Sequence, residues 1–241
     1  MRIICTLLFA VFAFTGCAKK GSEIRTAFAM TPQDTSKTAA PDSLNYLALG
    51  DSYTIGEAVP ASESFPYQLA RQLDSDHIAT KNPTIIAVTG WTTDNLIAAI
   101  ANSGLAGKKY DLVTLLIGVN DQYQGLSQDN YRIKFQQVLN TAIQFAGGNK
   151  NRVFVLSIPD YGVTPFAAGR DSIIGPQIDQ FNAINQNISV AAGVNYLDIT
   201  DISRQAGTDP SLIAADGLHP SAKMYGLWVE KLSPLVASEI K

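Results

Sequence analysis

The feature that most constrains the fold of this chain is an alternation of short apolar runs with longer helical patterns from residue 44 onward. Five of these runs have almost entirely apolar interiors, which is typical of strands covered by helices on both faces. The predicted strands are residues 45–50, 84–89, 112–118, 152–158 and 195–199. Because strands and helices alternate along the chain, the sequence predicts an α/β protein, a three-layer α/β/α sandwich around a five-stranded parallel sheet.

Helices are predicted between these strands and after the last of them. Their expected ranges are residues 66–73, 93–102, 128–146, about 177–192 and 222–240, with Pro234 as a break or kink in the last helix. Residues 159–175 then form the longest irregular loop. Ligands of parallel α/β sheets bind beyond the carboxyl ends of the strands, so functional residues are expected in loops that directly follow strands.

The composition excludes several classes of function. A net charge of -3, without clustered Lys and Arg, argues against a nucleic-acid partner. The only cysteines are Cys5 and Cys17, so residues 44–241 have no thiol for a disulfide, a zinc site or a cysteine nucleophile. The only histidines are His77 and His219, and His77 lies in a polar stretch predicted to be a surface loop.

The first residues have the layout of an export signal. Arg2 gives a positive start, residues 3–14 are apolar, and Phe14-Thr15-Gly16-Cys17 follows. The apolar run is about a dozen residues long, shorter than the roughly 20 that a membrane-spanning helix needs. The stretch resembles a bacterial lipobox, which implies a lipoprotein signal peptide over residues 1–16 and acylation of Cys17. The alternative is an ordinary signal peptide in which Cys17 is incidental.

Residues 17–43 are expected to form a flexible, lipid-anchored tether, because they mix small, polar and charged residues with no sustained period. More than one acyl chain is needed for stable anchoring, and the resemblance implies such multiple acylation at Cys17. The protein is therefore expected to be exported and held on a bacterial membrane, at its periplasmic or cell-surface face.

Gly50-Asp51-Ser52-Tyr53 stands at the end of the first predicted strand. A hydroxyl at this position is held at the edge of the sheet by rigid backbone, and the glycine permits a sharp turn. Serine is a weak nucleophile that needs a base. The alternative is a simple strand-to-helix turn in which Asp51 or Ser52 caps the next helix.

Two further motifs follow the second and third predicted strands. Gly90 offers a backbone N–H that no side chain obstructs, and Gly118-Val119-Asn120-Asp121 places an asparagine amide at a strand end. Both groups suit the stabilisation of a developing oxyanion. Both are also common in turns, so neither is decisive alone.

Asp216-Gly217-Leu218-His219-Pro220 lies near the carboxyl terminus. A catalytic histidine needs a partner that fixes its tautomer and stabilises the imidazolium. An aspartate three residues earlier can reach the ring across a single turn. The spacing therefore predicts an Asp216–His219 pair that acts as a base.

Together these four motifs resemble the SGNH (GDSL-type) hydrolase family, in order and over nearly the whole of residues 44–241. The resemblance implies the flavodoxin-like SGNH hydrolase fold and a catalytic triad of Ser52, His219 and Asp216. It implies an oxyanion hole made of the backbone N–H groups of Ser52 and Gly90 and the side chain of Asn120, and no metal or other cofactor.

One motif position departs from the family pattern, since Tyr53 stands where the family often has leucine. The position lies outside the reacting groups. Several other residues are expected either to line a substrate pocket or simply to pack: Tyr53, Trp91, Gln122, Tyr123, Tyr161, Pro165, Phe166 and Arg170.

The resulting hypothesis is a serine esterase acting through an acyl-serine on a small-molecule ester. No apolar insertion is long enough to form a lid, so short-chain acyl esters such as acylated carbohydrates are expected. The alternatives are a lysophospholipase-like lipid esterase, an acyltransferase and, less favoured, a non-catalytic surface binding protein. A nucleotide binder is disfavoured because the chain has no Gly-x-Gly-x-x-Gly or Gly-Lys-Ser/Thr loop.

Overall fold

A computed structural model describes residues 43–240 of the chain. The predicted signal peptide, Cys17 and the tether up to residue 42 lie outside the described residues. Five parallel strands form one sheet in the order β2-β1-β3-β4-β5. They are β1 (Tyr46–Gly50), β2 (Thr84–Ala87), β3 (Leu112–Leu116), β4 (Val153–Leu156) and β5 (Asn195–Leu197). The predicted α/β fold with a five-stranded parallel sheet is confirmed.

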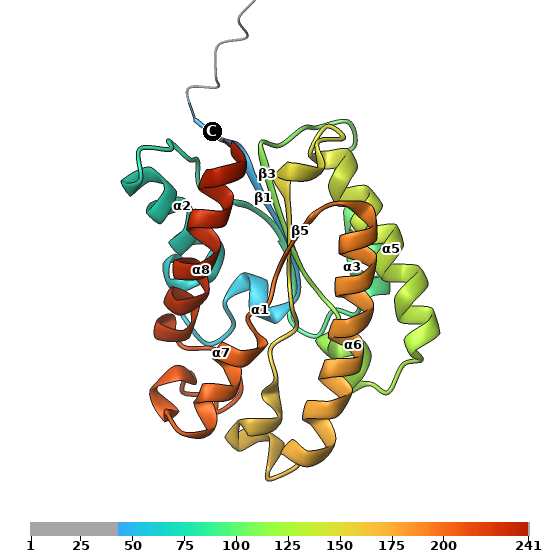
Figure 1. Ribbon diagram of the computed structural model, residues 1–241, viewed down its shortest axis with the longest axis vertical. Coiled ribbons are helices and arrows are strands. Elements are labelled where there is room, and N and C mark those ends of the chain that lie inside the picture. Colours follow the sequence, from blue (N-terminus) through green and yellow to red (C-terminus); the bar gives the residue numbers. More distant parts are fainter. Residues whose placement is uncertain (1–42, 241) are drawn as a thin grey trace, which may run out of the picture. The chain divides into compact units, whose positions relative to one another are not determined.

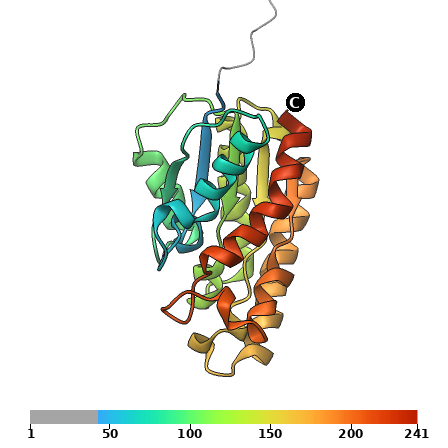
Figure 2. The same ribbon diagram turned by 90° about the vertical axis from the view of Figure 1, so that its left-hand side faces the viewer.

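Helices cover both faces of this sheet (Figure 1). One layer contains α2 (Phe65–Ser75) and α8 (Ala222–Ile240), which pack on each other. The other contains α3 (Thr93–Asn102), α5 (Gln128–Phe145) and α6 (Asp171–Ala192). Figure 2 shows α2 and α8 in front of the sheet. None of the helices within residues 43–240 is both long and apolar enough to span a bilayer.

Short helices occupy the connections. Three are α-helical: α1 (Ser52–Ile55), α4 (Val119–Tyr123) and α7 (Thr200–Arg204). The 3-10 turns are η1 (Ala61–Glu63), η2 (Lys150–Arg152), η3 (Tyr161–Val163), η4 (Pro165–Ala167), η5 (Gln205–Gly207) and η6 (Pro210–Leu212). Of these, α1, α4 and η3 follow the carboxyl ends of β1, β3 and β4, which places them where a ligand site is expected.

The strand order creates a topological switch point beside β1. The chain moves from β1 to β2 on one side, then crosses to β3 on the other side of β1. Because such crossovers are right-handed, the reversal puts α2 and α3 on opposite faces of the sheet. It leaves a crevice at the carboxyl ends of β1 and β3.

The register brings the carboxyl ends of three strands to one level. Gly50 pairs with Ala87 of β2 and with Leu116 of β3. The segments that follow these residues carry Ser52, Gly90 and Asn120. Strand pairing therefore gathers the predicted nucleophile and two predicted oxyanion donors at the same edge.

Burial follows the layer order. Every residue of the inner strands β1, β3 and β4 is buried, whereas the edge strands β2 and β5 are partly open. A cluster of fully buried aromatic rings joins α2 to α8: Phe65 lies 6.1 Å from Trp228, and Trp228 lies 5.0 Å from Tyr225 between ring centroids. These large rings seal one side of the core.

One helix prediction was wrong at its start. The helix expected from about residue 177 begins at Asp171, so the predicted loop 159–175 includes its first turns as well as η3 and η4. Packing on η3 outweighs the cost of Pro176 inside the helix. The helix predicted over residues 222–240 is confirmed as α8, which continues through Pro234 without the break that was one expectation there. Leu232 and Val236 on either side of that proline are fully buried, so core packing holds the helix together.

Candidate active site

Ser52 is the first residue of α1, immediately beyond β1. Asp51 caps this helix, and its carboxyl oxygen Oδ1 accepts a 3.0 Å hydrogen bond from the backbone N–H of Tyr53. Gly50 is needed here, because a Cβ at that position would lie 2.1 Å from Thr54 Oγ1 and 2.4 Å from the Leu116 carbonyl. The backbone N–H of Ser52 stands in the first turn, where a helix provides it no acceptor.

Asn120 lies at the start of α4, directly after β3. Gly118 makes the turn into this helix with φ of 128°, and a Cβ there would lie 2.6 Å from the Tyr131 hydroxyl. The Asn120 amide donates one hydrogen bond, of 3.0 Å, to the carbonyl of Trp91. Its second N–H is left for a ligand.

Two contacts tie the Gly90 turn to the end of β3. One is the bond from Asn120 to the Trp91 carbonyl. In the other, the buried carboxylate of Asp121 accepts 2.9 Å bonds from both the N–H and the hydroxyl of Thr93 at the start of α3. Gly90 itself has φ of 81° and open space at its Cβ position. The segment that directly follows Gly90 is therefore tied to the end of β3 at two points, Trp91 and Thr93.

His219 and Asp216 form a close pair on one turn after α7. Nδ1 of His219 and Oδ2 of Asp216 are 2.6 Å apart. The other oxygen of Asp216 accepts 3.0 Å bonds from the backbone N–H groups of Leu218 and His219. Gly217 has φ of 73° in this turn. The geometry fixes both the ring and the carboxylate, as a catalytic base and its orienting acid require.

Electrostatics keep Asp216 charged. Burial works to raise the pKa of its carboxyl, but the hydrogen bonds from the His219 ring and from two backbone N–H groups outweigh it, so the pKa is lowered. The His219 side chain is 9% exposed, and the ring of Tyr53 packs edge-on against it with centroids 5.6 Å apart. Tyr53 thus touches the predicted base, closer to the chemistry than its motif position indicates.

A single cavity of about 140 Å³ connects these groups. It is lined by Ser52, Gly90, Asn120 and His219 together with Tyr53, Thr89, Val119, Tyr123, Tyr161, Phe166 and Leu218. All predicted reacting groups and oxyanion donors except Asp216 therefore line one cavity. Asp216 is not among the lining residues and contacts Nδ1 of His219.

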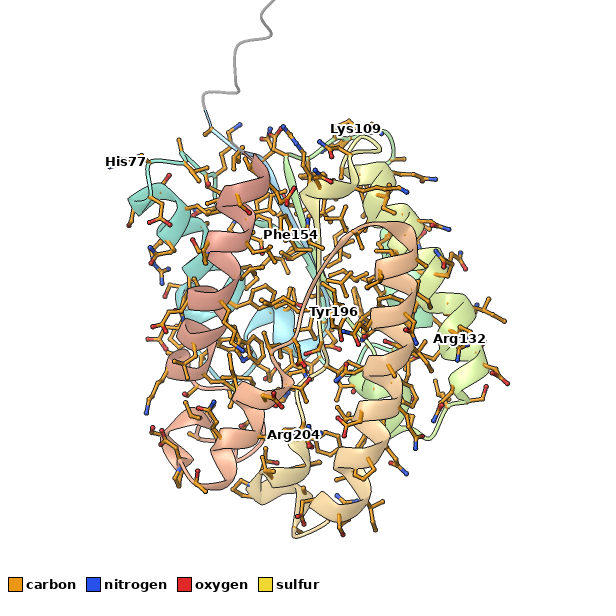
Figure 3. All side chains as sticks on the ribbon, viewed as in Figure 1. His77, Lys109, Arg132, Phe154, Tyr196 and Arg204 are labelled. Atoms are coloured by element: carbon orange, nitrogen blue, oxygen red, sulfur yellow. The ribbon has the colours of Figure 1, made fainter. Side chains whose placement is uncertain are left out.

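Of the other pocket candidates, four lie outside this cavity: Trp91, Gln122, Pro165 and Arg170. Three lining residues were not predicted, namely Thr89, Val119 and Leu218. Val119 and Leu218 adjoin Asn120 and His219 in sequence, which was a usable signal, whereas Thr89 was assigned to a strand. His77 is exposed, as predicted, and Figure 3 shows it at the outer end of α2, far from the loops at the carboxyl ends of the strands.

Asp51 has an unusual environment for a carboxyl group. It is fully buried, and its Oδ2 has no hydrogen-bond partner within residues 43–240. Burial raises its pKa to about 8, with the hydrogen bond from Tyr53 opposing the rise and the charge of Asp121 adding to it. At neutral pH this side chain is mostly uncharged.

A parallel α/β sheet that carries a serine, a His–Asp pair and amide donors around one cavity at its carboxyl edge has the parts of a serine hydrolase. The sequence narrows the class further, because residues 48–227 match the GDSL-like Lipase/Acylhydrolase family. The chain belongs to this family, which is one of ester hydrolases.

Solved structures share the fold. The psychrotrophic esterase EstA from Pseudoalteromonas sp. superposes with a TM-score of 0.61 at 17% identity, over 80% of this chain and 97% of EstA. For Axe2, an acetylxylan esterase from Geobacillus stearothermophilus, the TM-score is 0.61 at 17% identity, over 82% and 94%. A lipase/acylhydrolase from Enterococcus faecalis gives 0.58 at 24% identity, over 81% and 94%. No curated protein sequence matches the chain.

Proposed function

We propose that this protein is a serine esterase in which Ser52, His219 and Asp216 form the catalytic triad. The observation that carries the proposal is the shared cavity: Ser52 and His219 line it, and Asp216 holds the far nitrogen of the imidazole at 2.6 Å. Nδ1 is thereby occupied, and Nε2 remains as the atom that can take the serine proton.

The proposed reaction has two steps. Ser52 Oγ forms a bond to the ester carbonyl carbon while its proton passes to His219, and the imidazolium then protonates the departing alcohol. In the second step His219 takes a proton from water, the resulting hydroxide attacks the acyl-serine, and the proton returns to Ser52 Oγ as the acid leaves. The backbone N–H groups of Ser52 and Gly90 and the amide of Asn120 are proposed to stabilise the oxyanion in both steps.

The acyl group of the substrate is proposed to be short, and acylated carbohydrates are the proposed class. In support, the cavity measures only about 140 Å³. Each methylene buried in a fitting pocket adds about 0.8 kcal/mol, so a long-chain enzyme shows kcat/KM rising with every carbon. We expect a maximum at acetyl or butyryl among esters of one alcohol. A steady rise through octanoyl would favour a lipid esterase instead.

Two structural neighbours lend the substrate class further support, since AlAXEase and Axe2 are acetylxylan esterases on the same fold. The proposal also includes a location: acylation of Cys17 would hold the enzyme on a bacterial membrane.

Replacement of the nucleophile tests the proposal. We expect Ser52→Ala to remove ester hydrolysis while the protein keeps its fold, because only one oxygen atom is lost from the end of β1. The measurement is the rate of acetate release together with the denaturation midpoint. Ser62→Ala, which removes the hydroxyl of an exposed serine in η1, is the matched control and should hydrolyse like the parent. Substantial turnover by folded Ser52→Ala would disprove the triad.

A further inference from the structure

Three aromatic rings form one wall of the cavity: Tyr123 at the end of α4, Tyr161 in η3 and Phe166 in η4. Their centroids form a near-equilateral triangle with sides of 6.1, 6.2 and 6.3 Å. Interplanar angles of 46° to 71° show that no two rings are stacked in parallel. The esterase chemistry described above uses none of these side chains.

The three rings differ in exposure. Tyr161 is 5% exposed, whereas Tyr123 is 53% and Phe166 is 42% exposed. Tyr161 is therefore the buried ring of this wall, and we call it the floor ring. The two exposed rings, Tyr123 and Phe166, are called the rim. Large apolar side chains that gather in the open beside a cavity mark a surface that binds something.

The floor ring is fixed before any ligand arrives. Its hydroxyl donates a 3.0 Å bond to Gln122, whose amide in turn donates a 2.7 Å bond to Gln177 of α6. The preceding Asp160 accepts a 2.8 Å bond from Gly162 N–H and a 3.0 Å bond from Arg204. A surface held in this way loses little conformational entropy on binding.

The rim is attached to the turn that carries the catalytic base. The backbone N–H of Phe166 donates a 3.0 Å bond to the carbonyl of Gly217, between Asp216 and His219. In the proposed reaction His219 must protonate the departing alcohol, so the alcohol oxygen has to lie within hydrogen-bond reach of its ring. The rim is therefore on the side of the cavity where the alcohol part of an ester leaves.

We propose that Tyr123 and Phe166, with Tyr161 beneath them, bind the alcohol part of the substrate as a carbohydrate ring. This inference rests on the proposed esterase function. An aromatic face carries partial negative charge, and one face of a pyranose presents C–H groups that are weakly positive. Tyr123 is an exposed residue, and its hydroxyl adds a group that can hydrogen-bond with sugar hydroxyls. A long alkyl chain, in contrast, gains most when it is enclosed, and the rim leaves its occupant open to solvent.

The test compares two acetate esters that differ only in their alcohol, a methyl glucopyranoside carrying one acetyl group and ethyl acetate. In Tyr123→Ala and Phe166→Ala we expect the ratio of kcat/KM for the sugar ester to that for ethyl acetate to fall roughly five- to tenfold. Phe166→Tyr retains a ring and should keep the parental ratio. Val190→Ala truncates a 65% exposed apolar side chain of α6 outside the cavity and should also keep the parental ratio.

A second readout is independent of turnover. Methyl glucopyranoside without an acetyl group is titrated into Ser52→Ala, and we expect saturable binding that Phe166→Ala weakens by a similar factor. An unchanged ester ratio without sugar binding would overturn the proposal. A second outcome would also overturn the proposal: Phe166→Ala keeps the ratio of kcat/KM for the sugar ester to that for ethyl acetate, but now prefers octanoyl to acetyl esters. The rings would then limit the length of the acyl chain. Failure of the esterase function itself is distinct, since it appears as turnover that survives Ser52→Ala.

Discussion

At the scale of single residues, the two N–H groups of Asn120 have different partners. One is bonded to the Trp91 carbonyl, and the other is proposed to stabilise negative charge in the cavity. We expect Asn120→Ala to lower kcat by about 100- to 1000-fold, with little change in KM, because the lost donor matters most in the transition state. Steady-state kinetics on an acetate ester measure this, with circular dichroism to show retained folding. A rise in KM at constant kcat would make Asn120 a substrate contact only.

Asp51 gives a prediction about pH and stability. In the unfolded chain its carboxyl loses its proton near the ordinary value of 3.8, whereas in the folded protein the pKa is about 8. Between these values the folded state binds more protons, so a rise in pH lowers the free energy of unfolding, by at most about 1.4 kcal/mol per pH unit. This contribution is complete below about pH 4 and is lost as pH passes through about 8.

Asp51→Asn removes this titration and retains an oxygen that can accept the hydrogen bond from Tyr53 N–H. We therefore expect the loss of stability between pH 5 and pH 8 to be smaller in the variant than in the parent protein. Urea denaturation at the two pH values gives the comparison, and other titrating groups cancel between the two proteins. Equal slopes would show that Asp51 is ionised in the folded state.

At the scale of elements, α8 depends on the aromatic cluster that joins it to α2. Trp228 is fully buried between Phe65 and Tyr225. We expect Trp228→Ala to lower the free energy of unfolding by about 3–5 kcal/mol, since it leaves a large cavity between the two helices. Glu230→Ala, on the exposed side of the same helix, should change it by less than about 0.5 kcal/mol. A similar, small effect of both substitutions would contradict the packing.

The elements themselves were largely predictable, because the apolar strands and the helix periods are local signals. The prediction that failed, the start of α6, also rested on local sequence, and there tertiary contacts override the local signal. The helix was expected to start at about residue 177, yet α6 begins at Asp171, and Gly175 packs so close to Asp160 that a Cβ would lie 3.1 Å from the carboxyl oxygen Oδ2. That contact joins residues 15 apart along the chain and has no signature in either segment alone.

Some parts of the site could be predicted from the sequence and others could not. The predicted proximity of Asp216 and His219 is a property of one turn and is confirmed, although their catalytic roles stay a prediction. The bonds from Asn120 to Trp91 and from Thr93 to Asp121 span 29 and 28 residues, so they required the fold. The burial of Asp51 is also a consequence of the assembled core, because its four-residue motif is polar.

At the scale of the whole molecule, the proposed membrane location of the enzyme depends on Cys17. We expect Cys17→Ser to move the protein from the membrane fraction to the soluble exported fraction, since a serine cannot carry the thioether-linked lipid. Cys5→Ser, in the apolar run of the same segment, is the matched control and should leave the protein on the membrane. Fractionation followed by immunoblotting measures both. Membrane association of Cys17→Ser would mean that a different segment anchors the chain.

The pairing of Gly50 with both Ala87 and Leu116 limits which changes of length the enzyme tolerates. A strand advances about 3.3 Å per residue, a displacement larger than any hydrogen bond can absorb. One residue inserted into β1 would either shift Ser52 away from Gly90 and Asn120 by that distance or turn the apolar side chains of the strand to opposite faces. Insertions between α5 and β4 would do neither. Sequences related to this one are therefore expected to vary in length around their surface loops and to keep the residue count of β1 and β3 constant.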